Sequence, residues 1–118
     1  MKLPAFEYVR ALTPDQALEA FEQADADVRI LAGGQSLIAA LNFRLSEPTV
    51  LVDINRLTGW DQIDNRGETI RIGALVRHRQ LLESAVVKTH LPLLSEAIVQ
   101  VAHPAIRNRG TIGGSLAL

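Results

Sequence analysis

The sequence predicts an α+β fold: a small parallel β/α subdomain over residues 1–57, followed over residues 58–118 by the start of a second, mainly antiparallel α+β subdomain. Two observations support this prediction. The first part alternates β-prone runs with helical patterns, which is the order of a parallel β/α unit with right-handed crossovers. The second part places a turn signal between two β-prone segments, which indicates an antiparallel hairpin.

In the first subdomain, β-prone runs are predicted to form strands at residues 6–9, 28–32 and 50–54. The last of these is continuously apolar, as is typical of a parallel strand buried on both faces. Residues 13–16 read TPDQ, which offers an N-cap, a proline at the first helical position and a glutamine three residues after the cap. This combination predicts a helix start. A short helix is expected at 37–41.

The second subdomain is predicted to begin with a hairpin. Residues 60–64 and 68–73 flank the turn sequence Asn65-Arg66-Gly67, which suits an antiparallel connection. A brief helix is expected at residues 80–84. The sequence therefore changes from a parallel pattern to an antiparallel one near residue 58.

A longer helix is predicted to start at Pro92 and to end before Pro104, because the residue ahead of a proline disfavours the helical region. The last residues, 116–118, resemble the beginning of a strand. We therefore expect a truncated chain, whose sheet is completed by another polypeptide or by self-association.

The composition is that of a packed globular protein. Of the 118 residues, 47% are hydrophobic and 21% are charged, and the net charge is −1. Such a charge argues against a nucleic-acid surface, which needs clustered Lys and Arg. The chain has no cysteine, so we expect neither a thiolate zinc site nor an iron–sulfur cluster on it. No apolar run reaches the roughly 18 residues of a membrane span, and we expect a cytoplasmic protein.

Two glycine pairs are the strongest candidates for a binding site. One lies in residues 32–36, the first glycine loop, and the other in residues 111–115, the second glycine loop. Adjacent glycines permit positive φ and remove Cβ atoms, so successive N–H groups can converge on a phosphate oxygen. Two such loops together suit the two phosphates of a dinucleotide. Each pair alone is more often a tight turn or a bulge than a binding loop, so the prediction depends on the two pairs together. The sequence has neither a Rossmann nor a P-loop pattern.

Four segments closely resemble the flavin-binding subunit of molybdenum hydroxylases: LAGGQSLI at 31–38, NFRL at 42–45, LVDI at 51–54 and IRNRGTIGGS at 106–115. This family includes the medium subunit of aerobic carbon monoxide dehydrogenase and the FAD domain of xanthine dehydrogenase. The resemblance implies an incomplete PCMH-type FAD-binding fold, with both glycine loops on the FAD pyrophosphate. The cofactor-binding residues that it implies are Leu31, Ala32, Gly33, Gly34, Gln35, Ser36, Leu37, Thr111, Ile112, Gly113, Gly114 and Ser115.

The resemblance also implies an oxidoreductase in which electrons pass from a molybdenum centre through [2Fe-2S] clusters to FAD and then to an acceptor. The molybdenum cofactor is expected on a large partner subunit and the clusters on a small one. We expect no catalytic residue and no metal ligand in this chain, and no activity from the chain alone. Gln35 stands where relatives often have His, and Ser115 where many have Asn; both keep hydrogen-bonding ability.

Two alternatives remain open at this point. The chain is consistent with a truncated, non-catalytic relative that keeps only the fold and weak dinucleotide or phosphate binding. It is also consistent with a purely structural or self-assembling fragment.

Several other polar residues have two possible roles each. The three histidines, among them His78, have spacings that fit no metal site. Arg107 and Arg109 are equally suited to neutralising phosphate and to surface salt bridges. Asp53, at the end of a predicted buried strand, is expected either to hold a loop by capping backbone amides or to form an ion pair.

Overall fold

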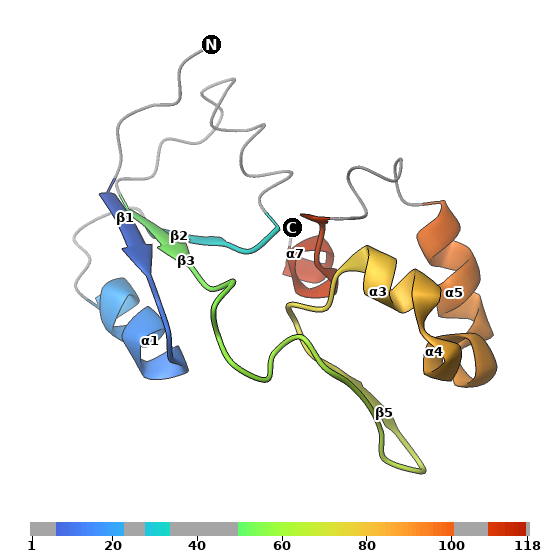
Figure 1. Cartoon of the computed structure of the whole chain (residues 1–118). Helices are drawn as coiled ribbons and strands as arrows, with labels where there is room; N and C mark the ends of the chain where they lie inside the picture. Colours follow the sequence, from blue (N-terminus) through green and yellow to red (C-terminus); the bar gives the residue numbers. More distant parts are fainter. Residues whose placement is uncertain (1–6, 23–27, 34–49, 101–108, 118) are drawn as a thin grey trace. The chain divides into compact units, whose positions relative to one another are not determined.

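The computed structural model describes residues 7–22, 28–33, 50–100 and 109–117, and the chain divides into two compact units, Met1–Thr58 and Gly59–Leu118. Each unit contains its own sheet, with strand order β1-β3-β2 in the first and β4-β5 in the second (Figure 1). The helix expected at 37–41 lies outside the described residues.

The sheet of the first unit is parallel, as predicted. It consists of β1 (Glu7–Arg10), β2 (Val28–Leu31) and β3 (Val50–Asp53), with β3 in the centre and parallel to both neighbours. Leu51 and Val52 on the central strand are buried, which explains its continuous apolar sequence. The register aligns the last residues of all three strands, so the chain leaves the sheet at one common edge.

The helix of the first unit, α1 (Pro14–Glu22), starts where the sequence predicts. The amide of Gln16 donates to Thr13 Oγ1 at 3.2 Å, while Gln16 Oε1 accepts from the amide of Leu12 at 2.7 Å. These reciprocal bonds satisfy amides that lack partners within the helix. The helix lies beside the sheet (Figure 1), and no residue of it is buried.

The second unit contains the predicted hairpin, formed by β4 (Ile63–Asn65) and β5 (Ile70–Ile72), which pair antiparallel. In the turn, Gly67 has a φ of 87°, a region that favours glycine. Its amide donates to Asn65 Oδ1 at 3.0 Å. The turn residues named by the sequence therefore close this hairpin.

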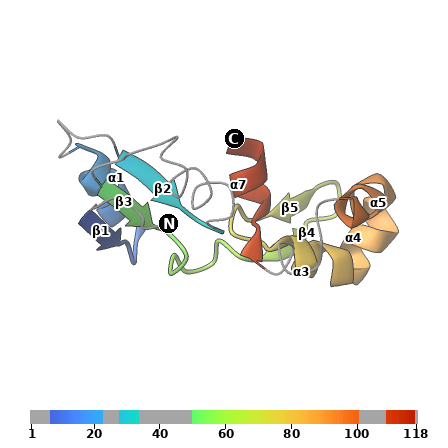
Figure 2. The ribbon, with the colours of Figure 1, turned by 90° about the horizontal axis from the view of Figure 1, so that it is seen from above.

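Three helices pack together in the second unit (Figure 2): α3 (His78–Glu83), α4 (Ala85–His90) and α5 (Pro92–Val99). The first and last correspond to predicted helices, but α4 was not predicted. Ser84, which the sequence placed inside the first helix, instead caps α4, because its Oγ accepts from the amide of Val87 at 3.2 Å.

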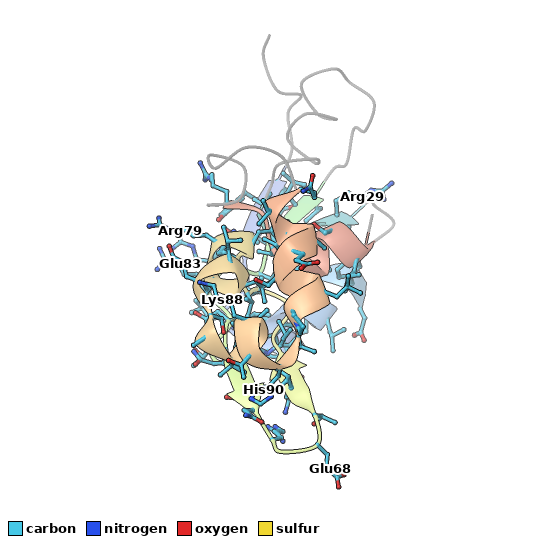
Figure 3. The ribbon with its side chains drawn as sticks, turned by 90° about the vertical axis from the view of Figure 1, so that its right-hand side faces the viewer. Arg29, Glu68, Arg79, Glu83, Lys88 and His90 are labelled. Atoms are coloured by element: carbon cyan, nitrogen blue, oxygen red, sulfur yellow. The ribbon has the colours of Figure 1, made fainter. Side chains whose placement is uncertain are left out.

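The faces of α3 differ sharply. His78 and Leu81 are buried, whereas Arg79 and Glu83 lie exposed on the opposite side and form an ion pair at 3.0 Å (Figure 3). An exposed pair with this spacing contributes only about 0.3–0.5 kcal/mol. Burial of the other face therefore holds this helix in place. The core there consists of Val76, Leu81, Val87 and Ile98.

The last element, α7 (Ile112–Ala117), contradicts the strand expected at residues 116–118. Thr111 pairs with Arg77 in an antiparallel bridge, and its Oγ1 then accepts from the amide of Gly114 at 3.1 Å. A threonine hydroxyl that binds the amide three residues later starts a helix. The three-residue apolar run was too short to distinguish a strand from a helix.

Replacing Leu81 with Ala is expected to lower the free energy of unfolding by about 2–5 kcal/mol, because it opens a cavity in the core of the second unit. The matched control is Leu93→Ala, at a side chain that is 78% exposed. Urea denaturation of both variants measures the difference. Equal stability of the two variants would contradict this description of the core.

Candidate functional site

Of the first glycine loop, the structure describes Ala32 and Gly33, which directly follow β2. The predicted binding residues 34–37 lie outside the described residues. The carbonyl of Ala32 accepts a hydrogen bond from Asn55 Nδ2 at 2.7 Å. The start of the loop is therefore held by a side chain that follows the central strand.

Asn55 is itself held by Asp53. Asp53 Oδ1 accepts from the amide of Asn55 at 2.9 Å and from its Nδ2 at 2.8 Å, and Asp53 Oδ2 accepts from the hydroxyl of Tyr8. Of the two roles expected for Asp53, holding a loop by capping a backbone amide is confirmed. The polar chain Tyr8–Asp53–Asn55 thus connects β1, β3 and the end of β2.

The carboxyl of Asp53 is ionised in this network. Burial raises its pKa, but the hydrogen bonds from Tyr8 and Asn55 and the charge of Arg10 outweigh burial, so the pKa lies below 3.8. The sequence analysis did not single out Tyr8 or Asn55. An asparagine two residues after an aspartate, at the end of a buried strand, is a local signal for Asn55. No such signal existed for Tyr8, which is 45 residues from Asp53.

The second glycine loop is fully described, and it forms the first part of α7. All four amides from residue 112 to residue 115 donate within the chain. The acceptors are Val76 O for Ile112 and Ala74 O for Gly113, both at 2.9 Å, then Thr111 Oγ1 for Gly114 and Thr111 O for Ser115, both at 3.1 Å. The expectation that these amides are bare phosphate donors is therefore wrong.

Gly113 was expected to permit a positive φ and the approach of a phosphate, but the structure requires a glycine here because of close packing against Ala74. The φ of Gly113 is not positive. A Cβ at this position would lie 2.6 Å from the carbonyl oxygen of Ala74, far closer than real Cβ atoms approach an oxygen. The glycine allows α7 to start directly against the segment that leads into α3.

The side chain of Ser115 is the polar group that this loop presents at the surface. Ser115 is exposed, and its Oγ lies 3.0 Å from Nε2 of His78, which is 3% exposed. Nδ1 of His78 is buried and has no hydrogen-bond partner within the described part of the chain. Burial lowers the pKa of His78 below 6.5, and the backbone of Thr111 partly opposes this shift. The ring is therefore neutral at pH 7.

No binding role was predicted for His78, and the described residues contain no cluster of His, Asp and Glu that could hold a metal ion. Its contact with Ser115 spans 37 residues, so local spacing could not reveal it. The carbonyl of Arg109 accepts from the Arg77 guanidinium, while Arg107 lies outside the described residues. Among the described helices, none is long and apolar enough to cross a membrane.

Replacing Asn55 with Ala is expected to lower the free energy of unfolding by about 1–3 kcal/mol, because the Ala32 carbonyl and the Asp53 carboxylate each lose a hydrogen bond. The control is Glu19→Ala on the exposed surface of α1, which should stay within about 0.5 kcal/mol of the wild type. Chemical denaturation measures both. An unchanged Asn55→Ala variant would show that the network does not hold the loop.

Acid is expected to destabilise the protein through His78. Its folded-state pKa lies below 6.5, so as the pH falls through about 6.5 the unfolded chain takes up a proton that the folded chain does not. The loss is at most about 1.4 kcal/mol per pH unit. His78→Leu should show a shallower fall than the wild type in denaturation curves between pH 7 and pH 5. If the free energy of unfolding fell equally with pH in the wild type and in His78→Leu, the result would contradict the burial of a neutral His78 ring.

Comparison with known proteins identifies the family. Residues 4–118 match the family model of the FAD binding domain in molybdopterin dehydrogenase. Over 117 residues the chain is 53% identical to the 6-hydroxypseudooxynicotine dehydrogenase complex subunit alpha of Paenarthrobacter nicotinovorans, covering 99% of this chain and 40% of the relative. It is 40% identical over 114 residues to the carbon monoxide dehydrogenase medium chain of Hydrogenophaga pseudoflava, covering 97% and 40%.

Solved structures agree. Carbon monoxide dehydrogenase from Hydrogenophaga pseudoflava superimposes with a TM-score of 0.95 at 40% identity, over 99% of this chain and 41% of that chain. Quinoline 2-oxidoreductase from Pseudomonas putida 86 gives 0.94 at 38% identity, with the same two coverages. The predicted α+β fold is confirmed, and the chain spans about 40% of the length of these relatives. The chain belongs to the family of FAD-binding domains of molybdopterin dehydrogenases.

Proposed function

We propose that this chain is the FAD-binding part of a molybdenum-hydroxylase-type oxidoreductase. In this proposal it works with a large subunit that carries the molybdenum cofactor and a small subunit that carries iron–sulfur clusters. The observation that carries the proposal is the family match over residues 4–118, which includes both glycine loops. The chain has no cysteine to ligate a cluster.

Within this proposal, residues 31–37 and 111–115 contact the FAD pyrophosphate. Bound FAD would supply the redox chemistry, and the protein supplies binding and orientation. The donors of the second glycine loop suit a phosphate in a specific way. Its amides from 112 to 115 are already used inside the chain, so the hydroxyl of Ser115, a residue exposed as a whole, is the group that it offers to a phosphate oxygen.

In the first glycine loop, the described residues Ala32 and Gly33 show how the start of the loop is held in position, and we assign them no hydrogen bond to the phosphate. Asn55 holds the Ala32 carbonyl, and Asp53 holds Asn55. This anchoring fixes Ala32 directly after β2, at the carboxyl ends of the parallel strands, where open parallel sheets bind ligands. We also propose a cytoplasmic location, which cell fractionation would test.

Ser115→Ala is expected to weaken FAD binding about 10- to 100-fold, as expected for loss of a hydrogen bond to a charged group. The matched control is Ser95→Ala on α5, outside both loops, which should bind like the wild type. Flavin absorbance and fluorescence titration of the intact protein, purified with any accompanying subunits, measure the affinity.

Two outcomes would contradict the proposal at different levels. A wild-type protein that stays colourless after incubation with FAD would contradict flavin binding. If ADP or pyrophosphate then still protected the backbone amides of the glycine loops, the result would favour the non-catalytic relative. Unchanged affinity in Ser115→Ala would contradict only the assignment of that hydroxyl.

A further inference from the structure

The pairing of a buried histidine with an exposed serine is the feature that packing alone does not explain. His78 is 3% exposed, and its Nδ1 has no hydrogen-bond partner among the residues that the structure describes. Burying an unsatisfied polar atom costs free energy, and an apolar side chain would avoid that cost. The ring forms a side-chain hydrogen bond with Ser115, whose Oγ lies 3.0 Å from Nε2. That bond is the feature a hydrocarbon side chain could not supply.

We propose that His78 is a positioning residue, whose Nε2–H donates to Ser115 Oγ and leaves the serine hydroxyl hydrogen free for a phosphate oxygen of the bound dinucleotide. This inference rests on the proposed function, since it assigns a role to His78 behind the FAD-binding loop. His78 itself does not touch the cofactor in this arrangement. It acts through Ser115.

The direction of the His78–Ser115 bond follows from the position of the ring proton. A neutral imidazole carries one N–H, which is a donor, and one bare nitrogen, which is an acceptor. Buried N–H groups without an acceptor are rarer than under-satisfied acceptors, as the backbone shows. Within the described residues Nδ1 is the nitrogen without a partner, so the proton belongs on Nε2, and its N–H is shared between Ser115 Oγ and the backbone carbonyl of Thr111, to which the ring is also hydrogen-bonded. Ser115 Oγ is then the acceptor.

The hydroxyl hydrogen of Ser115 has few competing acceptors within the chain. A helical serine often donates to the carbonyl four residues earlier, which here belongs to Thr111. That carbonyl already accepts from the amide of Ser115 at 3.1 Å, and the backbone of Thr111 also interacts with the His78 ring. Since Ser115 is exposed, its hydrogen is available to a ligand outside the chain.

The histidine is held rigidly enough to orient the serine. The amide of His78 donates to Gly110 O at 2.9 Å, and the amide of Ile112 donates to Val76 O at the same distance. These two bonds join the start of α3 to the start of α7. A turn later in α3, Leu81 is fully buried. The contact therefore runs from the core of the second unit to an exposed hydroxyl, which is how supporting residues usually hold a binding group.

The test compares two replacements of His78 in the intact protein. His78→Leu removes the donor, and we expect FAD affinity to fall about tenfold, the effect of one lost hydrogen bond. In His78→Gln the amide N–H can take the place of Nε2–H, and affinity should be largely restored. In a Ser115→Ala background, His78→Leu should cause no further loss, because the histidine acts through the serine.

The outcomes separate the two proposals. A wild-type protein that does not bind FAD contradicts the proposed function. If the wild type binds FAD but His78→Leu weakens binding equally with and without Ser115, the role of His78 is merely structural and the inference is overturned. Failure of His78→Gln to restore binding, with a wild-type melting temperature, overturns it as well.

A measurement on the wild type without FAD tests the tautomer directly. In a ¹H–¹⁵N correlation spectrum of the imidazole at pH 7.5, assigned by comparison with His78→Gln, we expect Nε2 to carry the proton and Nδ1 to be bare. A proton on Nδ1 would make Ser115 the donor to His78 and would overturn the inference, whatever the affinities are.

Discussion

The second glycine loop depends on backbone pairing between two segments that are more than 30 residues apart in the sequence. Amides of residues 78, 112 and 113 donate across this junction, to carbonyls of residues 110, 76 and 74 respectively. The pairing requires a glycine at 113, because a Cβ there would clash with the Ala74 carbonyl. The same bonds consume amides that the glycine-rich sequence would otherwise offer to a ligand. In the proposed function, the group that residues 112–115 offer to a phosphate is therefore a side-chain hydroxyl and not a backbone amide.

In each unit, taken separately, a polar side chain outside the glycine loop is hydrogen-bonded to a residue of that loop. In the first unit, Asp53 fixes Asn55, which holds the carbonyl of Ala32. In the second, a buried neutral His78 contacts the exposed Ser115. Both groups have a lowered pKa, and each is hydrogen-bonded to a residue in or next to a loop. This arrangement suits a domain that binds a redox cofactor and leaves the reaction to it.

Membership in the FAD-binding family gives these loops their functional meaning. The match extends over residues 4–118, and the relatives are more than twice as long as this chain. The described residues therefore bear on how the two glycine loops are held within their units. Contacts to the rest of a flavin, and to partner subunits, belong to the proposal for the whole protein.

The sequence by itself determined the elements whose signals are local. The helix start at 13–16, the turn at Asn65 to Gly67 and the buried strand at 50–53 each depend on side chains within a few residues of one another, and the motifs that resemble the flavin subunit are equally local. Only the tertiary structure decided that residues 112–117 form the helix α7, that the amides of residues 112–115 donate hydrogen bonds within the chain, and that His78 contacts Ser115. Two of the four amides use Thr111, which is local. The carbonyls of Ala74 and Val76 and the ring of His78 are brought to this loop from distant parts of the chain, so no local pattern of residues encodes these contacts.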